Sequence, residues 1–181
     1  AKAELTLRAV LKDFGAKGFT TNFDDLGDYN VEATGRGFDQ IPGLASQRMM
    51  HDGFGFGAEG DWKSAALYRT TWFMSQGLGE GTSFLEDYTL DFDGDKTAIL
   101  ESHMLEVNPD VSEYSKPRLE VHFLGIGIRK SPTARLVFTT KLCHGITTTI
   151  VDLGHRFRLT ANDVNLIQST PLPQLPVVSA L

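Results

Sequence analysis

Three side chains have the types and the spacing of a carboxylate–imidazole site. Glu59 follows a glycine-dense segment and precedes an expected helix, and Glu86 lies beside the apolar residues Phe84 and Leu85. His103 lies in an expected strand. Two carboxylates and an imidazole supply the oxygen and nitrogen ligands that suit Mn²⁺ or a similar divalent ion. They also suit acid–base chemistry, because a carboxylate can move a proton while a bound cation stabilises the developing charge.

Each of the three residues also has a purely structural interpretation. Glu59 is an acid at a helix N-terminus, where the helix dipole favours negative charge. Glu86 stands next to Asp87, as expected for a solvated strand edge. His103 shares a strand face with Glu101 and is typical of a hydrogen-bonded core histidine. Residue types and spacing leave both interpretations open.

Other chemical motifs are weaker. Cys143 and His144 are neighbours in an expected strand, so their side chains point to opposite faces and cannot form a nucleophile–base pair. The G-F-G-F-G segment at 53–57 lacks the last glycine of a dinucleotide fingerprint and is followed by Glu59, which would repel a pyrophosphate. The alternating aspartates at 91–95 resemble the start of a calcium loop, but no glutamate occupies the twelfth position.

The first half of the sequence alternates helix and strand signals. Helical spacing of apolar residues predicts helices over 2–14, from Pro42 to His51, and from a cap at Asp61 to Gly77. A strand is predicted over 18–23 and a strand end over 53–57. This order indicates part of a parallel α/β sheet.

The second half changes to strand periodicity. Six strands without an intervening helix predict a β-barrel or sandwich, and they cover residues 82–92, 97–107, 119–126, 134–140, 145–153 and 157–166. Three prolines after Thr170 predict that the tail, which ends in the apolar residues V-V-S-A-L, is an extended linker. We therefore expect an α/β segment, part of a Rossmann-like parallel sheet, over 1–100. A mostly antiparallel, incomplete β-barrel domain is expected over 101–181.

Composition excludes several classes of protein. The 181 residues carry a net charge of −6, which argues against a nucleic-acid partner. One cysteine excludes an intrachain disulfide and the usual thiolate zinc site. No apolar run approaches the roughly 20 residues of a membrane helix, and no leader opens the sequence. We expect a cytoplasmic globular protein without a membrane partner.

Several long strings resemble the L-arabinose isomerase family. They are G-A-E-G-D-W-K at 57–63, G-T-S-F-L-E-D-Y-T at 81–89, S-H-M-L-E-V at 102–107 and P-R-L-E-V-H-F-L-G-I-G at 117–127. The key residues in the first three strings are 27 and 17 residues apart, as in the family. Shorter strings at 41–45, 152–159 and 172–177 extend the likeness over nearly the whole chain.

The resemblance implies an activity and a site. The family interconverts L-arabinose and L-ribulose, and D-galactose and D-tagatose more slowly, through a cis-enediol and with Mn²⁺ or a similar ion. Its metal ligands map to Glu59, Glu86 and His103, and its catalytic pair maps to Glu59 and Glu86. The fourth ligand, a histidine in a later G-G-A-H-H string, has no counterpart here.

The sugar pocket maps to Phe23 and Phe84, and more weakly to Met104 and Ile126. Asn108 departs from the family, which usually has cysteine there. The resemblance further implies a homo-oligomer, a tetramer or hexamer, with active sites at subunit contacts. We expect the chain to be a middle-to-C-terminal portion of such an enzyme and inactive by itself. The alternative is a non-catalytic sugar- or metal-binding module. A carboxylate-pair glycosidase has Glu59 and Glu86 in its favour but no supporting string.

Overall fold

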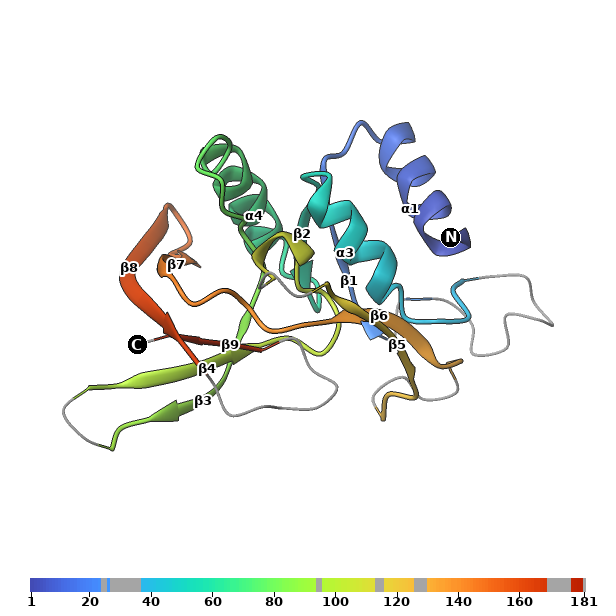
Figure 1. Cartoon of the computed structure of the whole chain (residues 1–181). Coiled ribbons are helices and arrows are strands. Elements are labelled where there is room, and N and C mark those ends of the chain that lie inside the picture. The colour runs from blue at the N-terminus through green and yellow to red at the C-terminus, as the bar shows by residue number, and fades with distance from the viewer. Residues whose placement is uncertain are drawn as a thin grey trace.

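The first part of the chain combines helices with a short parallel sheet. The computed structural model describes residues 1–23, 26, 37–93, 96–112, 116–125, 130–168 and 177–180. Strands β1 (Gly18–Thr21) and β2 (Gly55–Ala58) pair in parallel (Figure 1). The helices are α1 (Lys2–Asp13), α3 (Gly43–His51) and α4 (Trp62–Met74). The predicted alternation of helix and strand is confirmed, with ends shifted by at most a few residues.

Helix α4 packs tightly against β2 because two glycines remove the side chains between them. Asp61 caps α4 by accepting hydrogen bonds from the backbone N–H groups of Lys63 and Ser64. A Cβ atom on Gly55 would lie 2.2 Å from the carbonyl oxygen of Ala65. A Cβ atom on Gly57 would lie 2.1 Å from that of Asp61. The glycine-dense segment therefore lets the start of α4 approach the strand that leads to Glu59.

Gly57→Ala should lower the free energy of unfolding by about 2–3 kcal/mol, because a methyl group would be forced into backbone atoms. Urea unfolding of the variant measures this loss. The control is Gly125→Ala, since a Cβ atom there meets nothing within 4 Å. We expect the control to change stability by less than about 0.5 kcal/mol. Equal stability of the two variants would contradict the close approach of α4 and β2.

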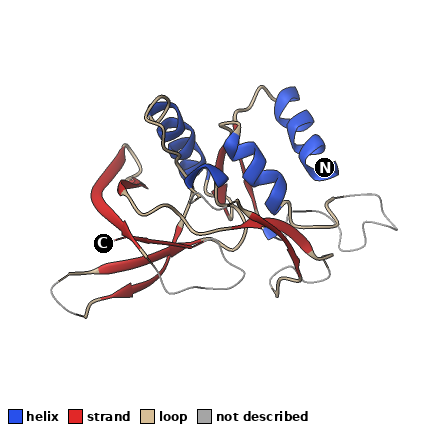
Figure 2. Cartoon of the chain, viewed as in Figure 1, coloured by secondary structure: helices blue, strands red, loops and turns tan. Residues whose placement is uncertain are grey.

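The second part of the chain is antiparallel. A five-stranded sheet has the order β3-β4-β9-β8-β7, and a separate pair joins β5 and β6. Figure 2 shows the helices gathered on one side of the molecule and the five-stranded sheet on the other. The strands are β3 (Glu86–Asp91), β4 (Ala98–Ser102), β5 (Arg118–His122), β6 (Thr133–Val137), β7 (His144–Asp152), β8 (Phe157–Ile167) and β9 (Val177–Ala180).

Three expectations need correction. Within the described residues the antiparallel strands form open sheets and no closed barrel, because β3 and β7 have neighbours on one side only. The apolar end is not wholly linker: Val177–Ala180 forms β9 between β4 and β8, as suits its β-branched valines. Residues 169–176 of the expected linker lie outside the described part. His103 is not inside a strand, because β4 ends at Ser102.

Two small apolar clusters form the core around the candidate site. Met50, Phe56 and Tyr68 form one cluster, and Phe84 packs against it. Leu26, Ile41 and Leu105 form the other, with the partly buried side chains of Phe23, Phe38, Met104 and Leu124 against it. Met104 and Leu105 belong to the second cluster, and His103 contacts Phe84 beside the first, so both clusters pack against the segment 103–108. Among the described helices, none has the length and apolar character needed to cross a membrane.

Candidate functional site

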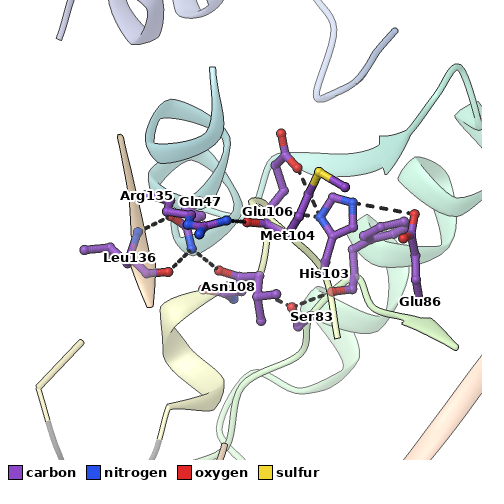
Figure 3. Close-up of polar contacts among 11 residues, drawn as sticks. Gln47, Ser83, Glu86, His103, Met104, Glu106, Asn108, Arg135 and Leu136 are labelled. Atoms are coloured by element: carbon purple, nitrogen blue, oxygen red, sulfur yellow. Dashed lines mark hydrogen bonds and ion pairs between the residues drawn. The ribbon is translucent and has the colours of Figure 1, made fainter. Parts of the chain in front are cut away.

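His103 lies at the centre of the candidate site, between two carboxylates. His103 is 4% exposed and follows directly after β4. Its Nε2 lies 3.5 Å from Oε1 of Glu86, and its Nδ1 lies 3.1 Å from Oε2 of Glu106 (Figure 3). The structure therefore brings together two of the three predicted residues, Glu86 and His103, and adds a carboxylate that the sequence analysis did not single out.

An aromatic ring forms one wall beside the imidazole. Phe84 packs edge-on against His103, with ring centroids 5.1 Å apart and an interplanar angle of 87°. The other side of Phe84 contacts Phe56, at 5.6 Å between centroids. This wall limits the access of water to the imidazole. The arrangement places an acid–base pair against an apolar surface, where electrostatic effects are larger than in water.

Burial and neighbouring charges shift both members of the pair. Burial raises the pKa of Glu86, and the negative charges of Glu59 and Glu106 raise it further, against an opposing effect of His103. Burial lowers the pKa of His103, but its hydrogen bond to Glu106 and the charges of Glu106, Glu86 and Glu59 outweigh burial and raise it. Glu86 is consequently a stronger base than an ordinary carboxylate.

Glu59 stands apart from the pair but acts on both members. It follows β2, is exposed, and has a φ of 52°, the only positive φ at a non-glycine residue among those described. Such a left-handed conformation costs about 1 kcal/mol and is enriched at functional sites. Glu59 influences Glu86 and His103 electrostatically, so the three lie in one neighbourhood. Across the described ranges, no three His, Cys, Asp or Glu side chains are close enough together to hold a metal ion.

The residues expected to line a sugar pocket fall into different places. Phe84 contacts the imidazole of His103. Phe23 and Met104 pack against the cluster of Leu26, Ile41 and Leu105. Ile126 lies outside the residues that the structure describes. The structure thus places one of the four expected contacts directly at the acid–base pair.

Buried polar side chains fix the backbone of the segment that carries His103. Gln47 on α3 donates from Nε2 to the carbonyl oxygens of Val107 and Leu136, each at 3.0 Å. Its Oε1 accepts from the N–H of Leu136 at 2.7 Å. Arg135 on β6 donates to the carbonyl oxygen of Met104. Helix α3 and strand β6 therefore hold residues 103–108 from two sides.

The sequence analysis missed Glu106, Gln47 and Arg135 as parts of this environment. Glu106 alternates with the apolar residues Leu105 and Val107, which predicts an exposed carboxylate, yet it is 3% exposed. Gln47 and Arg135 lie 56 residues before and 32 residues after His103. The one available signal was the position of Glu106 within the S-H-M-L-E-V string, three residues after His103.

Glu101 is a second buried carboxylate, on β4 opposite Asp87 of β3. It is 7% exposed, and burial, followed by the charge of Asp87, raises its pKa to about 7 from an ordinary value of 4.5. The folded state therefore binds more protons than the unfolded state between these two values. Stability should fall as the pH rises through this range and remain lower above pH 7.

Glu101→Gln should remove this effect, because an amide needs no proton to be neutral. We expect the variant to gain about 2 kcal/mol of unfolding free energy at pH 8 relative to the parent, and much less at pH 5. Urea unfolding at both pH values measures the difference. A gain of the same size at both pH values would show that the ionised carboxylate is not the cause.

The fold and the site together define a class. The chain is a mixed α/β protein with a small parallel sheet followed by antiparallel sheets. It carries a buried imidazole between carboxylates, a site suited to proton transfer and cation binding.

Comparison with protein families gives the particular family. The model described as the L-arabinose isomerase central domain matches residues 1–77, and the one described as the L-arabinose isomerase C-terminal domain matches residues 81–181. The chain belongs to the L-arabinose isomerase family, as the resemblance of its strings predicted.

Curated relatives agree with this family membership. The chain is 72% identical over 181 residues to L-arabinose isomerase of Phocaeicola vulgatus and 69% identical to that of Bacteroides thetaiotaomicron. It is 52% identical over 183 aligned residues to L-arabinose isomerase of Mycolicibacterium smegmatis. All of the chain is covered in each case. The chain spans only 34–35% of the length of these relatives.

Proposed function

We propose that the protein to which this chain belongs interconverts L-arabinose and L-ribulose through a cis-enediol, with D-galactose as a further substrate. The observation that carries the proposal is the contact of Glu86 with His103, 3.5 Å apart beside Phe84. It occurs within strings that resemble those of the family. We assign Glu59 and Glu86 as the catalytic pair, and Glu59, Glu86 and His103 as metal ligands.

The donor atoms of the site fit a divalent ion such as Mn²⁺. Ligand atoms bound about 2.1 Å from one ion at right angles lie about 3 Å apart. The 3.5 Å between Oε1 of Glu86 and Nε2 of His103 is close to this spacing. Glu59 would need to move toward the pair to join it. The bound ion would polarise the sugar carbonyl and stabilise negative charge on its oxygen.

The two carboxylates supply the proton transfers. One removes the proton from the carbon next to the carbonyl, and the electron pair of that C–H bond forms the double bond of the enediol. The other manages the return of a proton, to the carbon that was the carbonyl carbon, while the hydroxyl proton shifts between the two oxygens. The raised pKa of Glu86 favours this chemistry, because a more basic carboxylate takes a carbon-bound proton more readily.

The finer features of the family complete the proposal. Phe23, Phe84, Met104 and Ile126 would contact the sugar. The parallel strands would form part of a Rossmann-like sheet in the division 1–100, and the antiparallel strands part of a β-barrel in 101–181. The active protein would be a homo-oligomer, a tetramer or hexamer, with active sites at subunit contacts.

A ketose assay with L-arabinose tests the proposal. The full-length gene product should form L-ribulose with Mn²⁺ present, and removal of the ion by a chelator should abolish this activity. The 181-residue chain alone should form little or no ketose, because it spans about a third of its relatives' length. Binding of Mn²⁺ or sugar by the full-length protein without any ketose would favour the alternative, a non-catalytic binding module.

A further inference from the structure

Glu106 is a buried carboxylate for which the proposed chemistry has no role. In the sequence it stands between the fully buried residues Leu105 and Val107, and its Oε2 faces Nδ1 of His103 at 3.1 Å (Figure 3). In the described part of the chain, His103 is the one side chain recorded as an ion-pair or hydrogen-bond partner of this carboxylate. The buried charge therefore depends on the imidazole for its stabilisation.

The position of the imidazole proton decides whether this carboxylate has a donor. The backbone N–H of Glu106 also lies 3.0 Å from Nδ1, so two groups compete for that nitrogen. With the proton on Nε2, Nδ1 accepts from the amide, but its lone pair then faces a buried carboxylate. With the proton on Nδ1, the carboxylate gains a donor and one amide N–H loses an acceptor. An unpaired buried charge is far more unfavourable than one unpaired amide, so the arrangement with the proton on Nδ1 is favoured.

We propose that Glu106 is a positioning residue that orients the ring of His103 and holds its proton on Nδ1, which leaves the Nε2 lone pair facing Glu86. A histidine that binds a metal commonly donates its other ring N–H to a carboxylate in this way. The inference rests on the proposed function, because the direction of the Nε2 lone pair matters only if His103 receives a cation.

The opposite side of the ring explains why this arrangement favours a cation. Oε1 of Glu86 and the unprotonated Nε2 are both electron-pair donors, and they face each other at 3.5 Å. With neither a proton nor a metal ion between them, the two atoms bring like partial charges together. A divalent ion bound by both atoms would relieve it. Glu106 thus favours a cation between Nε2 and Glu86, although Glu106 itself lies on the Nδ1 side of the ring.

Glu106→Gln in the full-length protein tests the inference through metal binding. A carboxylate that accepts a hydrogen bond from a metal-binding histidine contributes roughly 10–100-fold to metal affinity. We expect isothermal titration calorimetry to show a loss of Mn²⁺ affinity in that range. Glu120→Gln is the matched control, because Glu120 also contacts a histidine, His122 Nε2 at 2.8 Å, on the β5–β6 hairpin. The control should bind Mn²⁺ as the parent does. Equal affinity of Glu106→Gln and the parent would overturn the inference.

A second measurement needs neither a variant of Glu106 nor a metal. Nitrogen NMR of histidine-labelled, metal-free protein distinguishes the two tautomers, and loss of a signal in His103→Gln assigns it. At a pH where His103 is neutral we expect its proton on Nδ1, and a proton on Nε2 alone would overturn the inference. This result stands even if Glu106→Gln does not fold. A parent protein that binds no Mn²⁺ would instead contradict the proposed metal role, so the two failures are distinguishable.

Discussion

Glu86→Gln should abolish isomerisation while the protein stays folded, with kcat lower by about 10³-fold. General acid–base catalysis by one positioned side chain contributes roughly 10²–10⁴-fold, and an amide can neither accept nor return a proton. Glutamine is nearly the same size as glutamate, so the packing around position 86 is preserved. The measurement is the initial rate of ketose formation from L-arabinose at saturating Mn²⁺, which separates the proton-transfer role from weaker ion binding.

We expect Glu86→Gln to leave the free energy of unfolding nearly unchanged, because the charge of Glu86 contributes little to stability. Burial and the charges of Glu59 and Glu106 disfavour the ionised form, and His103 only partly offsets them. A neutral amide removes these repulsions. Glu80→Gln is the matched control, since Glu80 pairs with Lys141 at 2.8 Å and has no contact with His103. The control should retain parental kcat, and a near-parental kcat for Glu86→Gln would refute the catalytic assignment.

Local sequence patterns were sufficient for most elements of the fold. The Asp61 cap and the glycines before it fix the β2–α4 connection, because both act within a few residues. The position of β9 could not be read in this way. Val177–Ala180 pairs with β4, almost 80 residues earlier, and periodicity carries no information on pairing partners. A barrel was expected for the same reason: six strand signals do not specify whether a sheet closes.

The candidate site shows the same division. Glu86 and His103 were found through strings that resemble the family, and the structure brings them to 3.5 Å. Glu106 was not found, since alternation predicts an exposed side chain at its position. It is buried because residues 103–108 leave the strand and turn, so that Glu106 folds back onto His103. The contact of Glu106 with His103 follows from the backbone path of this segment. That path depends on contacts with α3 and β6, which are distant in the sequence.

Asn108 ends this segment and should be the most sensitive anchor of its backbone. The side chain has 0% exposure, and Nδ2 donates to the hydroxyl oxygen of Tyr68 and the carbonyl oxygen of Thr82, both at 2.9 Å. Its Oδ1 accepts from the N–H of Asp110 at 3.1 Å. The backbone N–H of Asn108 donates to Ser83 Oγ at 2.9 Å. One amide side chain thus joins α4, the loop before Glu86 and the segment that carries His103.

Asn108→Ala should therefore lower the free energy of unfolding by about 3–4 kcal/mol. The three hydrogen bonds of this side chain contribute about 1 kcal/mol each, and the polar partners left without Asn108 and the remaining cavity add to the loss. Urea unfolding measures the change. Asn162→Ala is the control, because Asn162 is exposed on β8 and its loss should cost less than about 0.5 kcal/mol.

Asn108→Ala should also lower the catalytic rate. Thr82 precedes Phe84 and Glu86, and the side-chain amide of Asn108 ties it to the segment that begins at His103. The bond from the backbone N–H of Asn108 to Ser83 Oγ would remain. Losing the bond to Thr82 should let Glu86 and His103 drift from their 3.5 Å contact, so kcat should fall even under conditions where the variant is fully folded. A variant that loses stability but keeps parental kcat would show that the acid–base pair is held by the Gln47 and Arg135 contacts alone.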